Sequence, residues 1–235
     1  MLDPETQKKI EENNKQISSL LQENEMLLRQ AGFDPPMTNV VLPQEKLIQF
    51  PNGYIRRTTE FSSRYHLTSI FANRHSRQNI TYALEVSDLM NYVVNRLNIW
   101  GPVKTVFYKL AIVNLVSIME AILLEAANNI CQHANQCKGT GKCRKHFNKD
   151  ERNNARKALE KLVLIDVLDF DEAKVQRTLD IIELRNRIHI RLTPESELKL
   201  GDFNLKLYNE VILLLQDIDK QVFQKGVPLY GCAPF

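Results

Sequence analysis

The sequence predicts an all-α protein, and three observations lead to that class. Apolar residues recur three and four positions apart along several long segments, which is the period of a helix with one buried face. Alternation with period two, the pattern of a half-buried strand, is rare. Glycine is scarce, at 8 of 235 residues. Together these features predict helices that follow one another and pack as a bundle.

The overall composition excludes some classes of protein. Hydrophobic residues make up 43% of the chain and charged residues 25%, which excludes wholesale disorder. We find no apolar run long enough to predict a membrane span, and the polar, acidic start does not resemble a signal peptide. We therefore expect a cytoplasmic protein with no membrane partner. A net charge of +3 does not by itself indicate a nucleic-acid partner, so the local distribution of cations must be considered.

The first predicted helix covers residues 4–31 and carries a heptad seam, with charged and amide side chains at the outer positions. The seam residues are Ile10, Asn13, Ile17, Leu20, Asn24, Leu27 and Ala31. This spacing predicts a coiled coil, in which asparagine at the seam lowers stability but favours a defined register. The alternative is that the seam packs on the chain's own bundle. We assign residues 1–31 to a coiled-coil-type helix and expect a homodimer.

Residues 32–53 form a predicted linker, because Pro35, Pro36, Pro43 and Pro51 prevent a continuous helix. A helical body is expected to occupy residues 54–226, followed by an irregular tail at 227–235. The body begins with predicted helices at 54–72 and 78–99. Gly101 and Pro102 are expected to stop the second of these.

A group of cations lies in the first part of this body, with aromatic residues among them. The candidate nucleic-acid contacts here are Arg56, Arg57, Arg64, Arg74 and Arg77, with Tyr54, Tyr65 and Phe71 between or beside them. Arginines can bind backbone phosphates, and aromatic rings can stack on bases. In the alternative interpretation the arginines form a solvated helix face and the aromatic rings belong to the core.

The most apolar segment, residues 103–131, is predicted to run through the centre of the bundle. Glu120 lies in the middle of it. A carboxylate in such a helix is costly to bury unless it is paired or hydrogen-bonded. Arg185 is a candidate partner for it.

A polar insertion at 131–146 carries several potential metal ligands. Cys131, Cys137, Cys143 and His146 form one set of soft ligands for tetrahedral zinc, and His133 is an alternative to His146. Clustered cysteines in a cytoplasmic chain more often bind metal than form disulfides. The zinc would be structural, since four filled positions leave no site for water. The alternative is free thiols in a basic loop.

Three further helices are predicted at 150–168, from 175 to about 191, and at 203–224, with a turn at 166–171 before the second. Arg185 and His189 lie four residues apart in the second helix, so they share one face. A guanidinium beside an imidazole suits phosphate chemistry. Arg187, between them, is a further candidate nucleic-acid contact. Alternatively, these three residues form a basic helix end that complements the helix dipole.

Three segments of this region resemble the HEPN superfamily of α-helical bundles. They are IMEAIL at 118–123, LVLI at 162–165 and LRNRIH at 184–189, and the resemblance covers residues 103–226. The family's usual motif is an arginine, commonly followed by a polar residue, with four to six positions before a histidine. In this chain Arg185 and Asn186 match its start, but three residues separate Arg185 from His189.

The resemblance implies a dimeric, metal-independent endoribonuclease with RNA as its substrate, of a kind found in toxin and antiviral defence systems. Its implied catalytic residues are His189 for proton transfer, Arg185 for binding the phosphate, and Asn186 for positioning. We add Glu120 to the candidate catalytic residues as the possible partner of Arg185. No cofactor is implied for catalysis, and an antitoxin or sensor protein is an implied partner. The competing hypothesis is a non-catalytic dimeric scaffold that binds protein or nucleic acid.

Overall fold

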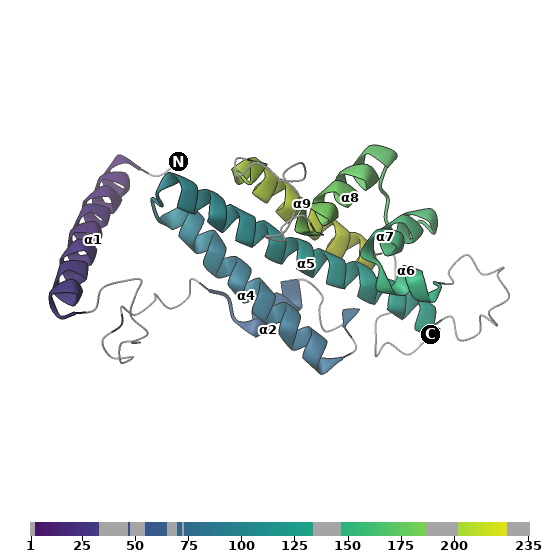
Figure 1. Ribbon diagram of the computed structural model, residues 1–235. Helices are drawn as coiled ribbons and strands as arrows, with labels where there is room; N and C mark the ends of the chain where they lie inside the picture. The colour runs from purple at the N-terminus through teal and green to yellow at the C-terminus, as the bar shows by residue number, and fades with distance from the viewer. Residues whose placement is uncertain are drawn as a thin grey trace. The chain divides into compact units, whose positions relative to one another are not determined.

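The computed structural model describes residues 3–32, 47, 55–64, 70–71, 73–133, 147–186 and 202–224. The chain divides into two compact units, Met1–Pro51 and Asn52–Phe235. Within the described ranges the regular elements are α-helices, and no strand occurs among them, which confirms the all-α class (Figure 1).

The first unit contains one long helix, α1 (Pro4–Gln30). The Asp3 side chain accepts a hydrogen bond from the backbone N–H of Thr6, and Pro4 occupies the first turn, where its missing N–H costs nothing. No residue of α1 is buried. The aliphatic seam side chains Ile10, Ile17, Leu20 and Leu27 are 42 to 60% exposed.

The second unit is organised around α5 (Gly101–His133), which is the central helix expected from its apolar sequence. Its most extensive contacts are with α4 (Arg74–Arg96) and α9 (Leu205–Gln224), and Figure 1 shows these two helices lying along it. Side chains such as Ile112, Val116 and Met119 are fully enclosed between these helices.

Three shorter helices also pack against α5. They are α6 (Lys149–Asn153), α7 (Ala155–Leu164) and α8 (Glu172–Asn186). The expectation that no apolar run is long enough to span a membrane is wrong for α5, which is sufficiently long and apolar by length and composition, although 56% of its most apolar stretch is buried within the protein. That burial is the usual property of the central helix of a bundle.

The predicted helix at 150–168 is not continuous. Asn154 has an extended backbone (φ −129°, ψ 111°) and separates α6 from α7. Its side chain accepts from the N–H of Lys157, as the Asn148 side chain does from Glu151. Asparagine favours this capping geometry, and so two helices start where one was expected. The second ends at Leu164, and Asp166 follows with φ 63° in the turn.

The boundaries of the neighbouring helices also differ from expectation. The helix predicted at 78–99 starts earlier, at Arg74, because Asn73 caps it, and it ends at Arg96. Gly101 and Pro102 begin α5 rather than ending a helix, since proline fits the first helical turn. Of the region predicted as helix at 54–72, the longest described helical piece is α2 (Thr58–Arg64).

Candidate functional site

The candidate site is built on an ion pair between α5 and α8. Nη1 of Arg185 donates a hydrogen bond to Oε2 of Glu120, so this partly buried carboxylate does have the partner proposed for it. The Glu120 side chain is 13% exposed, whereas that of Arg185 is 44% exposed. The guanidinium is therefore held on one side by Glu120 of α5, and its other side remains exposed to solvent.

The local sequence explains why these two side chains meet. In α5, Glu120 is preceded by the fully buried Met119, so its backbone is held deep in the bundle. In α8, Ile181 and Ile182 are buried and dock the helix on α5. Arg185 follows one turn later, on the last turn of α8. The apolar side chains set the docking of the two helices, and the ion pair forms at its edge.

Burial sets the protonation behaviour of this carboxyl. Loss of water raises the pKa of Glu120 above its ordinary value, although the charge of Arg185 and its hydrogen bond act in the opposite direction. The desolvation of Glu120 therefore outweighs the attraction of a single, half-exposed guanidinium. The pair holds Arg185 in position, but it does so at a cost in stability when the carboxyl is ionised.

A stability measurement can test this balance. Because the folded-state pKa of Glu120 is raised, its favourable contribution is full below the ordinary pKa of 4.5 and is lost as the pH rises through the folded value. We expect the free energy of unfolding of Glu120→Gln to increase relative to wild type between pH 4 and pH 7. Urea unfolding of both proteins across this range measures the difference.

Glu210 provides a control of opposite sign. It accepts two hydrogen bonds from Arg177, also on α8, and these lower the pKa of Glu210. Its contribution is therefore present above the ordinary pKa and is lost as the pH falls. Glu210→Gln should lose stability relative to wild type over the same rise in pH. If the free energies of unfolding of both variants change in the same direction relative to wild type as the pH rises, the opposite pKa shifts assigned to Glu120 and Glu210 are wrong.

The other proposed catalytic residues are less completely described. Asn186 is the last residue of α8, and its side chain lies outside the described residues. His189, like Arg187, also lies outside them. The structure thus brings Arg185 and Glu120 together and leaves the roles of Asn186 and His189 as predictions.

A cavity of about 270 Å³ lies beside the ion pair, with Glu120 in its wall. Residues from α8 and from the junction of α6 and α7 complete it, among them Asn153, Asn154, Arg156 and Glu183. Sequence reasoning missed these four. The consecutive residues Asn153 and Asn154 were the one sequence signal that the helix predicted at 150–168 is interrupted. That signal does not indicate that the interruption lies beside Glu120.

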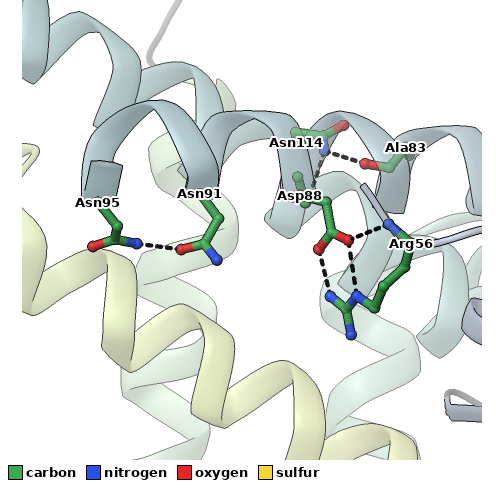
Figure 2. Close-up of polar contacts among 7 residues, drawn as sticks. Arg56, Ala83, Asp88, Asn91, Asn95 and Asn114 are labelled. Carbon is green, nitrogen blue, oxygen red and sulfur yellow. Dashed lines mark hydrogen bonds and ion pairs between the residues drawn. The ribbon is translucent and has the colours of Figure 1, made fainter. Parts of the chain in front are cut away.

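Arg56, predicted as a nucleic-acid contact, is engaged within the protein (Figure 2). The carboxylate of Asp88 accepts from its backbone N–H at 3.0 Å and from its Nε at 2.8 Å. The guanidinium also lies 4.7 Å from the ring centroid of the buried Phe61. Arg56 therefore fastens the segment before α2 onto α4, and a phosphate would have to compete with Asp88 for it.

The remaining predicted nucleic-acid contacts are partly accessible. Arg57 and Arg74 are exposed, and Arg77 is half-buried near the start of α4. The side chain of Arg64 lies outside the described residues. Phe71 is buried in the core, as the alternative interpretation expected, and its ring is not available to stack on a base. Tyr54 and Tyr65 are outside the described part of the chain.

No family model, curated protein or solved structure matches this chain.

The proposed zinc ligands cannot be located. Cys131 and His133 belong to the last turn of α5, but their side chains lie outside the described part of the chain. The other three candidates lie wholly outside it: Cys137, Cys143 and His146. Zinc binding at this insertion stays a prediction.

Proposed function

We propose that this chain is a homodimeric, metal-independent endoribonuclease of the HEPN type, acting in the cytoplasm within a toxin or antiviral system. The observation that carries the proposal is the exposed guanidinium of Arg185, held at the end of α8 by the partly buried Glu120. It lies directly before Asn186 and four residues before His189. An antitoxin or sensor protein is the proposed regulatory partner.

The proposed chemistry is transfer of a phosphodiester within RNA. The ribose 2′-hydroxyl loses its proton and attacks phosphorus, the bond to the 5′-oxygen breaks, and that oxygen gains a proton. A dimer supplies two copies of His189, so one imidazole can accept a proton while the other donates one. Arg185 binds the phosphate oxygens and stabilises the negative charge that develops on them, and Asn186 positions the phosphate.

Glu120 serves this chemistry as a positioning residue. A long arginine side chain loses much rotamer freedom when it binds a phosphate, and an ion pair with a rigid helix removes part of that cost beforehand. Glu120 engages Nη1, and the guanidinium has further N–H groups with which to bind a phosphate.

The dimer is supported by α1, whose aliphatic seam side chains are about half exposed in the single chain. A second copy would bury them, and the paired α1 helices would raise the effective concentration of one body near the other. The HEPN resemblance implies that two such sites face one another in a shared cleft.

A scaffold without catalysis is the second candidate. The observation favouring it is the same ion pair, because Glu120 already compensates the charge of Arg185 and could serve only to join α5 to α8. The short spacing between Arg185 and His189 also suits this alternative.

The two functions are separated by incubating purified protein with total RNA and with tRNA in EDTA. The enzyme should produce fragments that end in 2′,3′-cyclic phosphate and 5′-hydroxyl groups. RNA that is bound in a gel-shift assay and recovered intact would support the scaffold. Intact RNA without binding, together with unchanged cellular phenotypes of Arg185 and His189 variants, would contradict the enzyme.

Zinc at the insertion 131–146 is proposed separately, as a structural ion. We expect about one zinc per chain in protein purified without chelator, held by Cys131, Cys137, Cys143 and His146 or His133. Elemental analysis of the wild type and of Cys137→Ser measures it, and Cys232→Ser is the matched control outside the insertion. A zinc content far below one, or equal in both variants, would contradict the assignment.

A further inference from the structure

The turn between α4 and α5 exposes large apolar side chains at one end of the bundle. α4 ends at Arg96 and α5 begins at Gly101, and the two helices lie side by side, so residues 97–103 form the tip of a helical hairpin (Figure 1). Within this hairpin tip Trp100 is 75% exposed and Leu97 is 48% exposed, and Val103 is exposed as well. Apolar side chains that gather at one place, in contrast to singly scattered ones, mark an interaction surface.

The apolar surface continues from the hairpin tip along α5. Val103, Val106 and Leu110 are three and four residues apart, so they share one helix face, and all three are exposed. The backbone holds Trp100 at the start of this helix, because its carbonyl oxygen accepts the N–H of Lys104 at 3.1 Å. The protein therefore presents its tryptophan on a hydrogen-bonded turn that leads into an apolar helix face.

Two cations flank the hairpin tip. Arg96 is exposed on the last turn of α4, and Lys104 is half-buried on the first turn of α5. Between Asp88 and Glu120 the sequence contains no acidic residue, and each of these two carboxylates pairs with an arginine elsewhere in the bundle. The hairpin tip thus combines apolar side chains with positive charge that its own sequence does not compensate.

This combination distinguishes between partners. In a symmetric pair of hairpin tips, the cations of both copies would meet without acidic side chains of the tips to balance them. A membrane surface with anionic lipids suits both properties, since it receives apolar side chains and its phosphates attract cations. Tryptophan is typical of the boundary between headgroups and acyl chains. A lysine there can extend its ammonium group to the headgroups while its stem stays in apolar surroundings.

We propose that the hairpin tip docks on the surface of a membrane that contains anionic lipids. Trp100 and Leu97 enter the headgroup region, and Arg96 and Lys104 bind lipid phosphates. The contact is peripheral, because α5 keeps 56% of its most apolar stretch buried within the protein. The expectation of no membrane partner followed from the lack of a predicted span, whereas a surface contact needs only a short apolar insertion.

Docking at the hairpin tip does not depend on the proposed ribonuclease and does not cover its candidate site. Glu120 lies 20 residues after Trp100, which is roughly 30 Å along the helix. Figure 1 shows α6, α7 and α8 against the part of α5 that is distant from its junction with α4. The Arg185 site and the membrane contact are therefore separate surfaces of the same bundle.

Tryptophan fluorescence tests the proposal directly, because Trp100 is the only tryptophan of the chain. The full-length protein is titrated with vesicles of equal parts phosphatidylglycerol and phosphatidylcholine, and with vesicles of phosphatidylcholine alone. We expect the emission to move to shorter wavelength with the anionic vesicles and much less with the neutral ones. Brominated acyl chains in the anionic vesicles should quench it.

Three outcomes of this titration would overturn the proposal. Unchanged emission with anionic vesicles, even when the protein sediments with them, would mean that other cations of the chain make the contact. An equal response to both kinds of vesicle would remove the role of the cations. A shift that grows with protein concentration in the absence of vesicles would identify a second copy as the partner of the hairpin tip.

A pair of leucine variants tests the apolar part of the contact by sedimentation with anionic vesicles. Leu97→Asp should weaken binding at least about tenfold, because it replaces a buried apolar group with a charge that the lipids repel. Leu213→Asp is the matched control, since Leu213 is a 66% exposed leucine on α9, outside the hairpin tip. It should bind as wild type does. Equal binding by the two variants would contradict insertion at the tip.

The cations are tested in the same assay. Arg96→Gln and Lys104→Gln should each weaken binding about fivefold, and the losses should multiply in the double variant. The control double variant, Arg156→Gln with Lys157→Gln, removes the same charge from α7, where these side chains are 57% and 47% exposed. If both double variants lose binding equally, net charge alone attracts the protein to the vesicles, and the hairpin tip is not the docking site.

Discussion

Arg185→Ala and His189→Ala proteins are expected to lose RNA cleavage by a factor of about 10² to 10⁴ each, with the fold retained. Removing His189 takes away the group that transfers protons, while removing Arg185 leaves the charge on the phosphate unstabilised. Initial rates on a fluorescent RNA in EDTA measure the loss. Circular dichroism and thermal unfolding check that each variant is folded.

Arg177→Ala is the matched control for Arg185. Both arginines lie on α8, both pair with a glutamate of a neighbouring helix, and their side chains are 49% and 44% exposed. Loss of a helix-to-helix ion pair is thus common to both variants. If cleavage falls equally in Arg177→Ala and Arg185→Ala, the effect of Arg185 is structural and its catalytic role is wrong.

Arg185→Lys refines the same experiment. Lysine keeps the positive charge and can still pair with Glu120, but it lacks the planar fork that binds two phosphate oxygens at once. We expect this variant to stay folded and to lose most of the activity. Full activity in Arg185→Lys would show that charge alone suffices, contrary to the proposed bidentate contact.

Leu20→Asp is expected to convert the proposed dimer to monomer. The Leu20 side chain is 60% exposed in the single chain, and burial at a seam would contribute about 1 kcal/mol for each copy. An aspartate there would also place two like charges in the interface, which costs several kcal/mol more. Sedimentation velocity and light scattering should report the mass of two chains for wild type and one for the variant.

Met26→Asp is the control that makes this experiment decisive. Met26 is 59% exposed on the same helix, nearly as much as Leu20, but it lies at an outer heptad position. Within an isolated chain the two substitutions should be equivalent, whereas in a coiled coil only Leu20→Asp disrupts the contact. Equal masses for both variants would contradict the seam. If the cleft is shared between protomers, cleavage at low protein concentration should fall with the dimer in Leu20→Asp alone.

Much of the fold could be predicted from apolar periodicity. The central position of α5 followed from its continuous apolar sequence, and the helical state of α1 from the spacing of its apolar residues. The helix boundaries were less predictable, because they depend on single capping side chains. Those of Asn73, Asn148 and Asn154 each accept a backbone N–H at the start of a helix. An asparagine in a polar stretch fits a cap or a solvated position equally well until its backbone is known.

The candidate site could be predicted in part. The need of Glu120 for a partner follows from the cost of burying a carboxylate, and Arg185 was named as a candidate for it. Arg56, by contrast, was grouped with other cations as a nucleic-acid contact. Its pairing with Asp88 joins residues 32 positions apart in sequence, and no local pattern indicates it.

By itself, the sequence determined the all-α class and the approximate position of most described helices, because apolar periodicity depends on neighbours within a few residues. Only the tertiary structure decided that α8 docks so that Arg185 reaches Glu120, and that the break at Asn154 faces the same carboxylate. Both outcomes depend on how α5, α7 and α8 pack together. The packing of several side chains sets that geometry at once, so no single segment encodes the cavity.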